Sequence, residues 1–240
     1  QAWGPITLNN NPVTDKTSSL SLVVNKETKG RIEVTKVDAA NTGKKLQGAE
    51  FTLTGPNDFS QTVTTDATGM AVFNNLELGV AYTLRETKAP DGYVATYQGE
   101  TITLNTPLEV VKKTVNNTAK PFLKVKKTAK DVTTGTPSTL SGVVFEVYQK
   151  QTDGSFTRVE NLSLTTGANG ESGPVQLPEA GEYYLKETYP DSVVRPEDVQ
   201  TLYSGKGELS KDGDFYFGPF EAKNGETAIC AIENILNSGK

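Results

Sequence analysis

The sequence predicts an all-β protein made of two β-sandwiches in tandem. Short segments alternate apolar and polar residues, and Gly, Asn and Asp separate them at intervals typical of a sandwich or barrel. No segment sustains the apolar period of a helix, and the best helical stretch is a short turn at Pro196–Gln200. The whole strand pattern also occurs twice along the chain. Together these observations favour two similar β domains over one larger domain.

The first half of the chain supplies one complete set of strand signals. In "GRIEVTKVD" (30–38) Ile32 and Val34 share a face, which is typical of a strand with one buried side. Residues 61–76 have the pattern of a strand, a glycine turn and a second strand. Further strands are expected at residues 49–55, 81–87, 100–105 and 108–117.

The second half repeats these segments in the same order, at residues 121–131, 140–149, 165–177, 183–193 and 231–240. A repeat distance of about 100 residues exceeds the period of solenoid repeats and indicates tandem domains. We therefore expect domains at 30–119 and 120–240, the second with longer loops. Residues 1–29 are interpreted as the remnant of a preceding domain or as an added strand. The reason is that Asn25 precedes Lys36 at nearly the spacing by which Asn117 precedes Lys127.

The composition argues against several classes of function. The chain of 240 residues has no His and one Cys. This excludes Ser-His-Asp and Cys-His catalytic sets, His-ligated metal sites and an intrachain disulfide. A net charge of −5 argues against a nucleic-acid groove or an anionic membrane partner, and no apolar run approaches bilayer-spanning length. No cofactor and no metal is expected, and a β protein that is stable without disulfides fits this composition.

The strand pattern places three polar side chains on buried faces in each repeat. In "YTLRETK" (82–88), for example, Glu86 continues the face of Tyr82 and Leu84. An isolated polar group in an apolar core is unfavourable, so the three side chains are expected to meet one another. The two sets are Lys36, Glu86 and Asn117 in the first repeat, and Lys127, Glu187 and Asn234 in the second.

Each residue taken alone has an ordinary explanation. A Glu near a strand end is usually solvated, a Lys in a strand is usually an edge or snorkelling residue, and an Asn is usually a turn residue. Matched spacing in two repeats favours a shared role instead. Asn116 and Lys126 are the nearest rivals of Asn117 and Lys127, and the alternation of faces favours the latter pair.

Three segments carry a resemblance to a known family: "GRIEVTKVDAANTGKKLQGAEFTL", "YTLRETKAPDGY" and "TVNNTAK". They resemble the CnaB or SpaA-like repeat domains of Gram-positive collagen adhesins and sortase-assembled pilins. The similarity covers residues 30–119 closely and 120–237 more loosely. The second copy, "ETYPDSVV", lacks the counterparts of Lys88, Ala89 and Gly92. The resemblance implies immunoglobulin-like (CnaB-type) sandwiches.

The resemblance also implies an intramolecular isopeptide bond in each domain. The Lys amine attacks the side-chain amide carbon of Asn, ammonia leaves, and a Glu assists. The residues support this chemistry independently, because burial favours the neutral amine that attack requires. A protonated Glu in the same core can donate a hydrogen bond to the amide carbonyl and transfer the proton. The assignment is Lys36–Asn117 and Lys127–Asn234 as cross-links, with Glu86 and Glu187 as catalytic acids.

The function implied is a structural stalk or shaft segment of a cell-wall-anchored pilin or adhesin, outside the cell and without enzymatic turnover. Its partners would be other pilin subunits or a host surface or extracellular-matrix ligand, with sortase assembling or anchoring the full-length protein. The alternative is a host-ligand-binding module that uses loops 150–162 and 190–220. There "DFYFGPF" (214–220) is either a tip cluster or a strand. A hydrolase is disfavoured by the missing His and by the lack of a paired carboxylate site outside the cores.

Two weaker signals have simple interpretations. Asp212 and Asp214 in "SKDGDF" (210–215) are expected in a hairpin turn, because the other ligands of a calcium loop are absent. Cys230 alternates inward with Ala228 and Ile232, so it is expected to be a small core residue.

Overall fold

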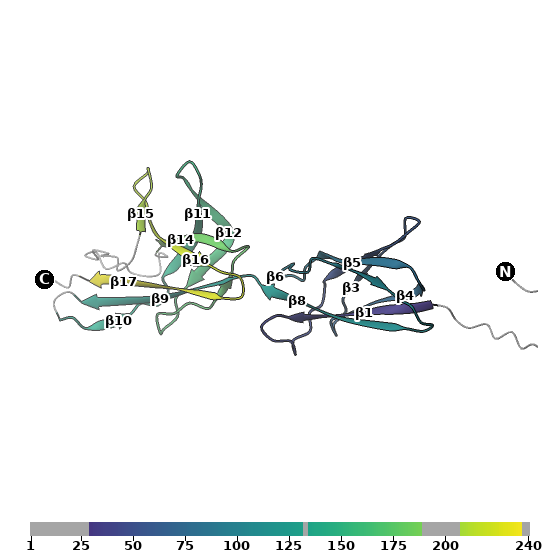
Figure 1. Ribbon diagram of the computed structural model, residues 1–240. Helices are drawn as coiled ribbons and strands as arrows, with labels where there is room; N and C mark the ends of the chain where they lie inside the picture. The colour runs from purple at the N-terminus through teal and green to yellow at the C-terminus, as the bar shows by residue number, and fades with distance from the viewer. Residues whose placement is uncertain (1–28, 132–133, 189–206, 237–240) are drawn as a thin grey trace, which may run out of the picture.

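The computed structural model describes residues 29–131, 134–188 and 207–236. Figure 1 shows two β-sandwiches that lie end to end along the chain. This confirms the predicted all-β class and its tandem arrangement in the described residues. Within the same ranges, no helix has the length and apolar character needed to cross a membrane. The segment 1–28 with Asn25, and the turn expected at Pro196–Gln200, lie outside the described residues.

The first sandwich consists of two facing sheets, with strand orders β4-β1-β8-β6 and β3-β2-β5-β7. Its strands follow the predicted segments closely, except that the short β6 was not predicted. The strands are β1 (Lys29–Asp38), β2 (Glu50–Thr54), β3 (Ser60–Thr64), β4 (Met70–Glu77), β5 (Ala81–Lys88), β6 (Tyr93–Val94), β7 (Glu100–Thr103) and β8 (Val110–Ala119).

The second sandwich has the same plan with larger hairpins. One sheet has the order β12-β11-β14-β16-β15, and in the other β9 pairs with β10, β13 and β17. Residues 165–177 were matched to residues 64–76 of the first repeat. The strand expected there is reduced to the two-residue β13 and isolated bridges at Glu171 and Ser172. The strands are β9 (Phe122–Asp131), β10 (Pro137–Thr139), β11 (Val144–Lys150), β12 (Phe156–Thr165), β13 (Val175–Gln176), β14 (Gly181–Thr188), β15 (Gly207–Leu209), β16 (Phe215–Ala222) and β17 (Thr227–Leu236).

Each sandwich pairs its first and last strands in parallel, β1 with β8 and β9 with β17. Parallel neighbours need a crossover connection, and here the rest of the sandwich provides it. The two strands that carry the predicted Lys and Asn are therefore direct neighbours in both sandwiches.

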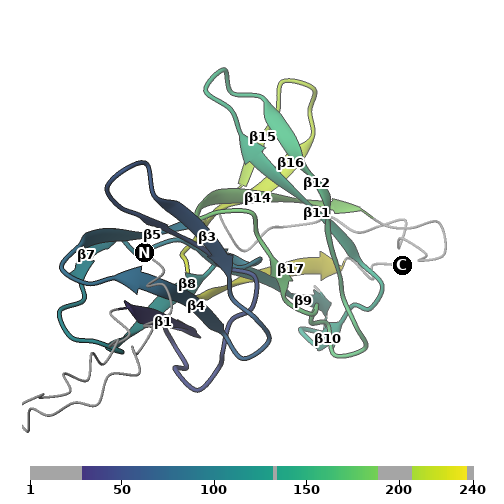
Figure 2. The ribbon, with the colours of Figure 1, turned by 90° about the vertical axis from the view of Figure 1, so that its right-hand side faces the viewer.

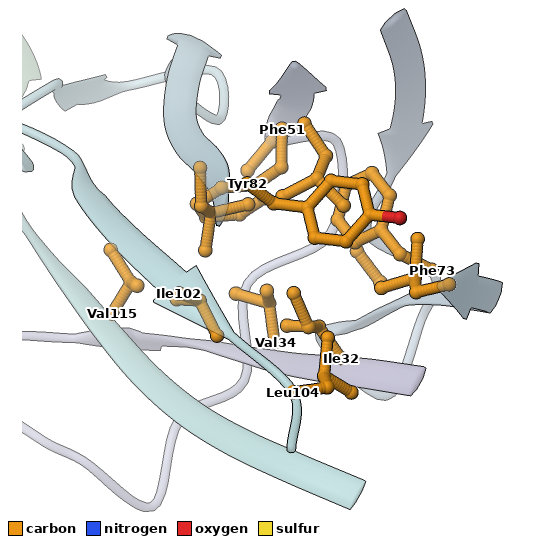
Figure 3. Packing of buried hydrophobic residues seen from close by; sticks show 13 residues of the cluster. Ile32, Val34, Phe51, Phe73, Tyr82, Ile102, Leu104 and Val115 are labelled. Carbon is orange, nitrogen blue, oxygen red and sulfur yellow. The ribbon is translucent and has the colours of Figure 1, made fainter. Parts of the chain in front are cut away.

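The core of each sandwich is formed by the inward-facing residues of its two sheets. Figure 3 shows the first core, in which Ile32 and Val34 of β1 lie among Phe51, Phe73 and Tyr82. Inward residues alternate with outward ones from Gly30 to Lys36 of β1, as the sequence pattern predicts, and Val37 and Asp38 at its end are both buried. A separate core fills the second sandwich and includes Phe145, Tyr183, Leu185, Phe217 and Cys230.

A two-residue linker joins the sandwiches, and its backbone is well hydrogen-bonded. The Lys120 amide donates to the Gly92 carbonyl at 2.9 Å, and the Leu177 amide donates to Pro121 at 2.8 Å. The Gln176 side-chain amide also donates to Gly92 from the second sandwich, at 3.0 Å. The "PDGY" turn of the first sandwich is thus part of the joint between the two units.

Candidate functional site

The three polar residues predicted for the first repeat meet in the core of the first sandwich. Lys36 Nζ donates to Asn117 Oδ1 at 2.5 Å and lies 3.1 Å from Glu86 Oε1. Asn117 Nδ2 donates to the same Glu86 oxygen at 2.8 Å. The side chains of Lys36 and Glu86 have no solvent exposure. The cluster is therefore closed to water and internally paired.

The strand register explains how Lys36 and Asn117 meet. On the parallel strands β1 and β8, Lys36 is opposite Val115, and Asn117 is opposite Asp38. The Asn is thus two positions further along, and its side chain is on the same inward face as the Lys. Glu86 comes from β5 in the opposite sheet and reaches the pair across the sandwich.

The second cluster has the same construction. Lys127 Nζ donates to Asn234 Oδ1 and lies 3.1 Å from Glu187 Oε1, and Asn234 Nδ2 donates to that carboxylate at 3.4 Å. The register offset is also repeated, since Lys127 is opposite Ile232 and Asn234 is opposite Ala129. Each of the two sandwiches therefore contains its own cluster of Lys, Asn and Glu, and the two clusters have the same arrangement.

A glycine turn fixes the backbone of each Lys. The Lys36 amide donates to the Gly69 carbonyl at 2.7 Å, and the Lys127 amide donates to Gly170 at the same distance. Both glycines have φ of +74°, a conformation that favours glycine. A Cβ at Gly69 would also lie 2.7 Å from the Lys36 carbonyl oxygen. Only glycine allows this close approach to the strand that carries the Lys.

The environment of each Lys favours the uncharged amine. Burial lowers the pKa of Lys36 and of Lys127 below the usual value, and it outweighs the opposing attraction of Glu86 and Glu187. The Lys36 amine lies 5.8 Å from the centre of the Phe51 ring. A neutral amine is the form that can act as a nucleophile.

The hydrogen bond between Glu86 and Asn117 differs from the one that the sequence predicted. The sequence hypothesis had the Glu donate to the amide carbonyl, but Glu86 Oε1 accepts from the amide nitrogen of Asn117 instead. The other oxygen, Oε2, is buried and has no hydrogen-bond partner in the described residues. The carboxyl group therefore lies between the amine and the nitrogen that would depart as ammonia.

The rival residues lie outside both clusters. Asn116 and Lys126 are exposed, while their neighbours Asn117 and Lys127 have no exposure. The alternation of faces along β8 and β9 thus separates the rivals as predicted.

Two residues beside the first cluster were missed. Asp38, which is opposite Asn117, accepts a hydrogen bond from the Tyr93 hydroxyl at 2.7 Å. Asp38 is two residues after Lys36 and so lies on the same inward face, which the alternation along the strand could have revealed. The sequence pattern gave no such indication for Tyr93, because the two-residue strand that carries it follows a turn.

The weaker signals are placed in ordinary structure. Cys230 is buried in the second core, and Asp212 and Asp214 lie in the turn between β15 and β16. "DFYFGPF" is mostly strand β16, so the strand alternative is the right one. Among the described residues, no group of acidic or Cys side chains is arranged to hold a metal ion.

Comparisons with known proteins agree with this architecture. A family model described as "SpaA: Prealbumin-like fold domain" matches residues 30–119. The comparison with curated protein sequences gave no match.

Three solved structures illustrate the similarity. The Bacillus anthracis TIE protein is 28% identical over 86% of this chain and 34% of that chain, with a TM-score of 0.42. A streptococcal ancillary pilin is 22% identical over 88% of this chain and 63% of that one (TM-score 0.40). The shaft pilin SpaA from Lactobacillus rhamnosus GG is 17% identical over 89% of this chain and 100% of that one, with a TM-score of 0.47. The chain thus spans about a third of the TIE protein's length.

The fold and the two clusters define a class: tandem β-sandwiches, each with a buried Lys on its first strand, a buried Asn on its last strand and a Glu that reaches them from the facing sheet. Within this class, the first sandwich, residues 30–119, matches the family model described as a SpaA prealbumin-like fold domain.

Proposed function

We propose that this chain is a structural stalk or shaft segment of a cell-wall-anchored pilin or adhesin. In this proposal each sandwich is locked by an autocatalytic Lys–Asn isopeptide bond. The observation that carries the proposal is the contact of Lys36 with Asn117 and Glu86, whose side chains are buried, repeated with the same register by Lys127 and Asn234. The SpaA match of the first sandwich supports the same function.

The reaction needs no external reagent. The neutral Lys36 amine attacks the amide carbon of Asn117, and a new C–N bond forms. Glu86 accepts a proton from the attacking nitrogen and returns it to the departing nitrogen, which it already contacts. The old C–N bond then breaks, and one ammonia leaves. The fold supplies the proximity that makes an amine and an unactivated amide react.

The bonds would carry tension from one end of the chain to the other. A pull on β1 would pass at Lys36 into Asn117 on β8, through the short linker, and at Lys127 into Asn234 on β17. Most of each sandwich would then lie outside the stretched path and could not unravel. This property suits a stalk, whose function is to hold other parts of a surface protein away from the cell.

The partners and location follow from the same proposal. We infer an extracellular, cell-wall-anchored position on a Gram-positive bacterium, with other pilin subunits or an extracellular-matrix ligand as partners and sortase as the anchoring enzyme. Each Lys reacts once and is consumed, so the chain is not an enzyme in the sense of turnover.

The alternative of a host-ligand-binding module has one feature in its favour. The β11–β12 and β15–β16 hairpins project from the second sandwich (Figure 2). However, the aromatic rings there pack on one another, with Phe156 stacked on Tyr216 at 4.0 Å and edge-on to Tyr184 at 5.0 Å. The cluster is therefore better explained as the packing that holds the hairpins together.

Peptide mapping tests the proposed bonds directly. A protease digest of the folded chain should contain two branched peptides, one joining Lys36 to Asn117 and one joining Lys127 to Asn234. The exposed neighbours Lys126 and Asn116 serve as internal controls and should appear in no additional branch. A digest that contains only linear peptides would rule the proposal out.

A further inference from the structure

We propose that Asp38 and Tyr93 act as positioning residues for the first cross-link, by fastening together the two strands that flank Asn117. The inference rests on the proposed function and adds residues that the cross-linking chemistry alone does not require. It also gives a role to the "PDGY" part of the loop after β5.

The sheet order sets up this contact. Strand β8 lies between β1 and β6, and Asn117 is near its end. Asp38 on β1 is opposite Asn117, while Tyr93 on β6 is opposite Ala119. The 2.7 Å hydrogen bond from the Tyr93 hydroxyl to Asp38 Oδ2 therefore links β1 and β6 across β8. We call this contact the strap.

Both ends of the strap are themselves held. Asp38 Oδ1 accepts from the Ala40 amide at 2.8 Å, and Lys44 Nζ lies 3.6 Å from Oδ2 and 5.5 Å from the centre of the Tyr93 ring. The Ala39 amide donates to the Asn117 carbonyl at 2.9 Å. The backbone of Asn117 is thus attached directly to the turn that Asp38 organises.

This attachment matters because the reaction depends on the position of the amide. The Lys36 backbone is held by its turn with Gly69, so the strap acts on the other reacting strand, at the end of β8. A last strand that frays at Asn117 would move the amide away from the amine and from Glu86. Small misplacements of reacting groups reduce rates strongly.

The second sandwich provides a natural comparison. The residue opposite Asn234 is Ala129, whose side chain has no group that could accept a hydrogen bond. The second site therefore has no Asp at the place of Asp38, although its Lys, Asn and Glu are arranged in the same way. A change to the strap should affect the first cross-link and leave the second unaffected.

The experiment follows both cross-links during the first folding of the 240-residue chain, which is made by chemical synthesis and kept in denaturant so that no bond has yet formed. Ammonia loss is timed by mass spectrometry and assigned to each sandwich by digestion, while circular dichroism follows folding. Tyr93→Phe should slow the first cross-link about 3- to 10-fold, as expected for a looser reacting pair, without slowing folding or the second cross-link. Tyr97→Phe is the matched control, because Tyr97 donates to Glu100 at 2.8 Å elsewhere in the same sandwich.

Two further variants separate positioning from simple destabilisation. Asp38→Ala should slow the first cross-link at least as much as Tyr93→Phe does, because it also removes the bond from the Ala40 amide. Asp38→Asn should restore most of the rate because it keeps a hydrogen-bonding partner for Tyr93. The double variant Tyr93→Phe/Asp38→Ala should be no slower than Asp38→Ala alone, since the contact that Tyr93→Phe removes is already lost in Asp38→Ala. Independent, additive slowing would overturn the proposal.

The possible failures are distinguishable. If the unmodified chain loses no ammonia, the proposed function fails and the strap proposal fails with it. If the unmodified chain loses ammonia but Tyr93→Phe reacts at the same rate, or slows both cross-links equally, only the strap proposal is overturned.

Discussion

Lys36 and Asn117 lie two register positions apart on adjacent parallel strands, and Lys127 and Asn234 repeat this offset in the second sandwich. The offset brings an amine and an amide together at the junction of the first and last strands. A Glu from the opposite sheet contacts both groups in each case. This geometry makes the following predictions.

Asn117→Ala should destabilise the first sandwich far more than Asn116→Ala. The cross-link closes a chain segment of 81 residues, and a covalent closure of that length is worth about 4.5 kcal/mol in the chain-entropy treatment used for disulfides. The exposed Asn116 should contribute less than about 0.5 kcal/mol. Denaturant unfolding of both variants measures the difference, and equal free energies of unfolding would show that no covalent closure is lost.

Glu86→Gln should abolish the first cross-link and spare the second. Gln retains the shape of Glu but cannot accept a proton from the amine and return it to the departing nitrogen. The intact mass should then show the loss of one ammonia only. Glu100→Gln is the control, because Glu100 pairs with Lys113 at 2.6 Å outside the cluster, and it should retain both bonds. A Glu86→Gln chain that loses two ammonia molecules would remove Glu86 from its proposed role.

The first cross-link should form at a rate that depends on pH through Lys36. Burial lowers the pKa of Lys36 below its usual 10.5, so the neutral amine is populated at a lower pH than in an exposed Lys. The rate should therefore rise with pH and level off once pH exceeds this lowered pKa. Time courses of ammonia loss during the first folding of a synthetic, never-folded chain at a series of pH values measure the profile. A rate that still rises tenfold per unit up to about pH 9 would indicate an amine with an ordinary pKa.

Gly69→Ala should be more harmful than Gly79→Ala. Both glycines have positive φ, at +74° and +70°, so either Ala incurs backbone strain of roughly 1–2 kcal/mol. Only at Gly69 would the new Cβ also approach the Lys36 carbonyl oxygen, whereas nothing lies within 4 Å at Gly79. Gly69→Ala should lower the melting temperature more and delay the first cross-link. Equal effects on both measurements would show that the turn does not position Lys36.

The sequence predicted the composition of both clusters because parity along a strand is a local property. Lys36, Glu86 and Asn117 each share the inward face of their own strand with apolar residues. The exposed rivals Asn116 and Lys126 lie on the outward faces of their strands. Most strands of the first sandwich followed from the same alternation. The repeat then made an accidental arrangement of polar residues improbable.

Other features depended on contacts that alternation cannot reveal. The bond between Tyr93 and Asp38 joins strands that are distant in sequence, and the two-residue β6 is too short to show a period. The side of the Asn117 amide that meets Glu86 is decided by the packing of two sheets. The pairing of Gln176 with Gly92 depends on how the two sandwiches meet.

The mass of the intact, unmodified chain tests the central claim most directly. Two isopeptide bonds remove two ammonia molecules, so the measured mass should fall below the sequence mass by that amount. The deficit should persist after complete denaturation, because the bonds are covalent. A denatured chain whose mass equals the sequence mass would contradict the account.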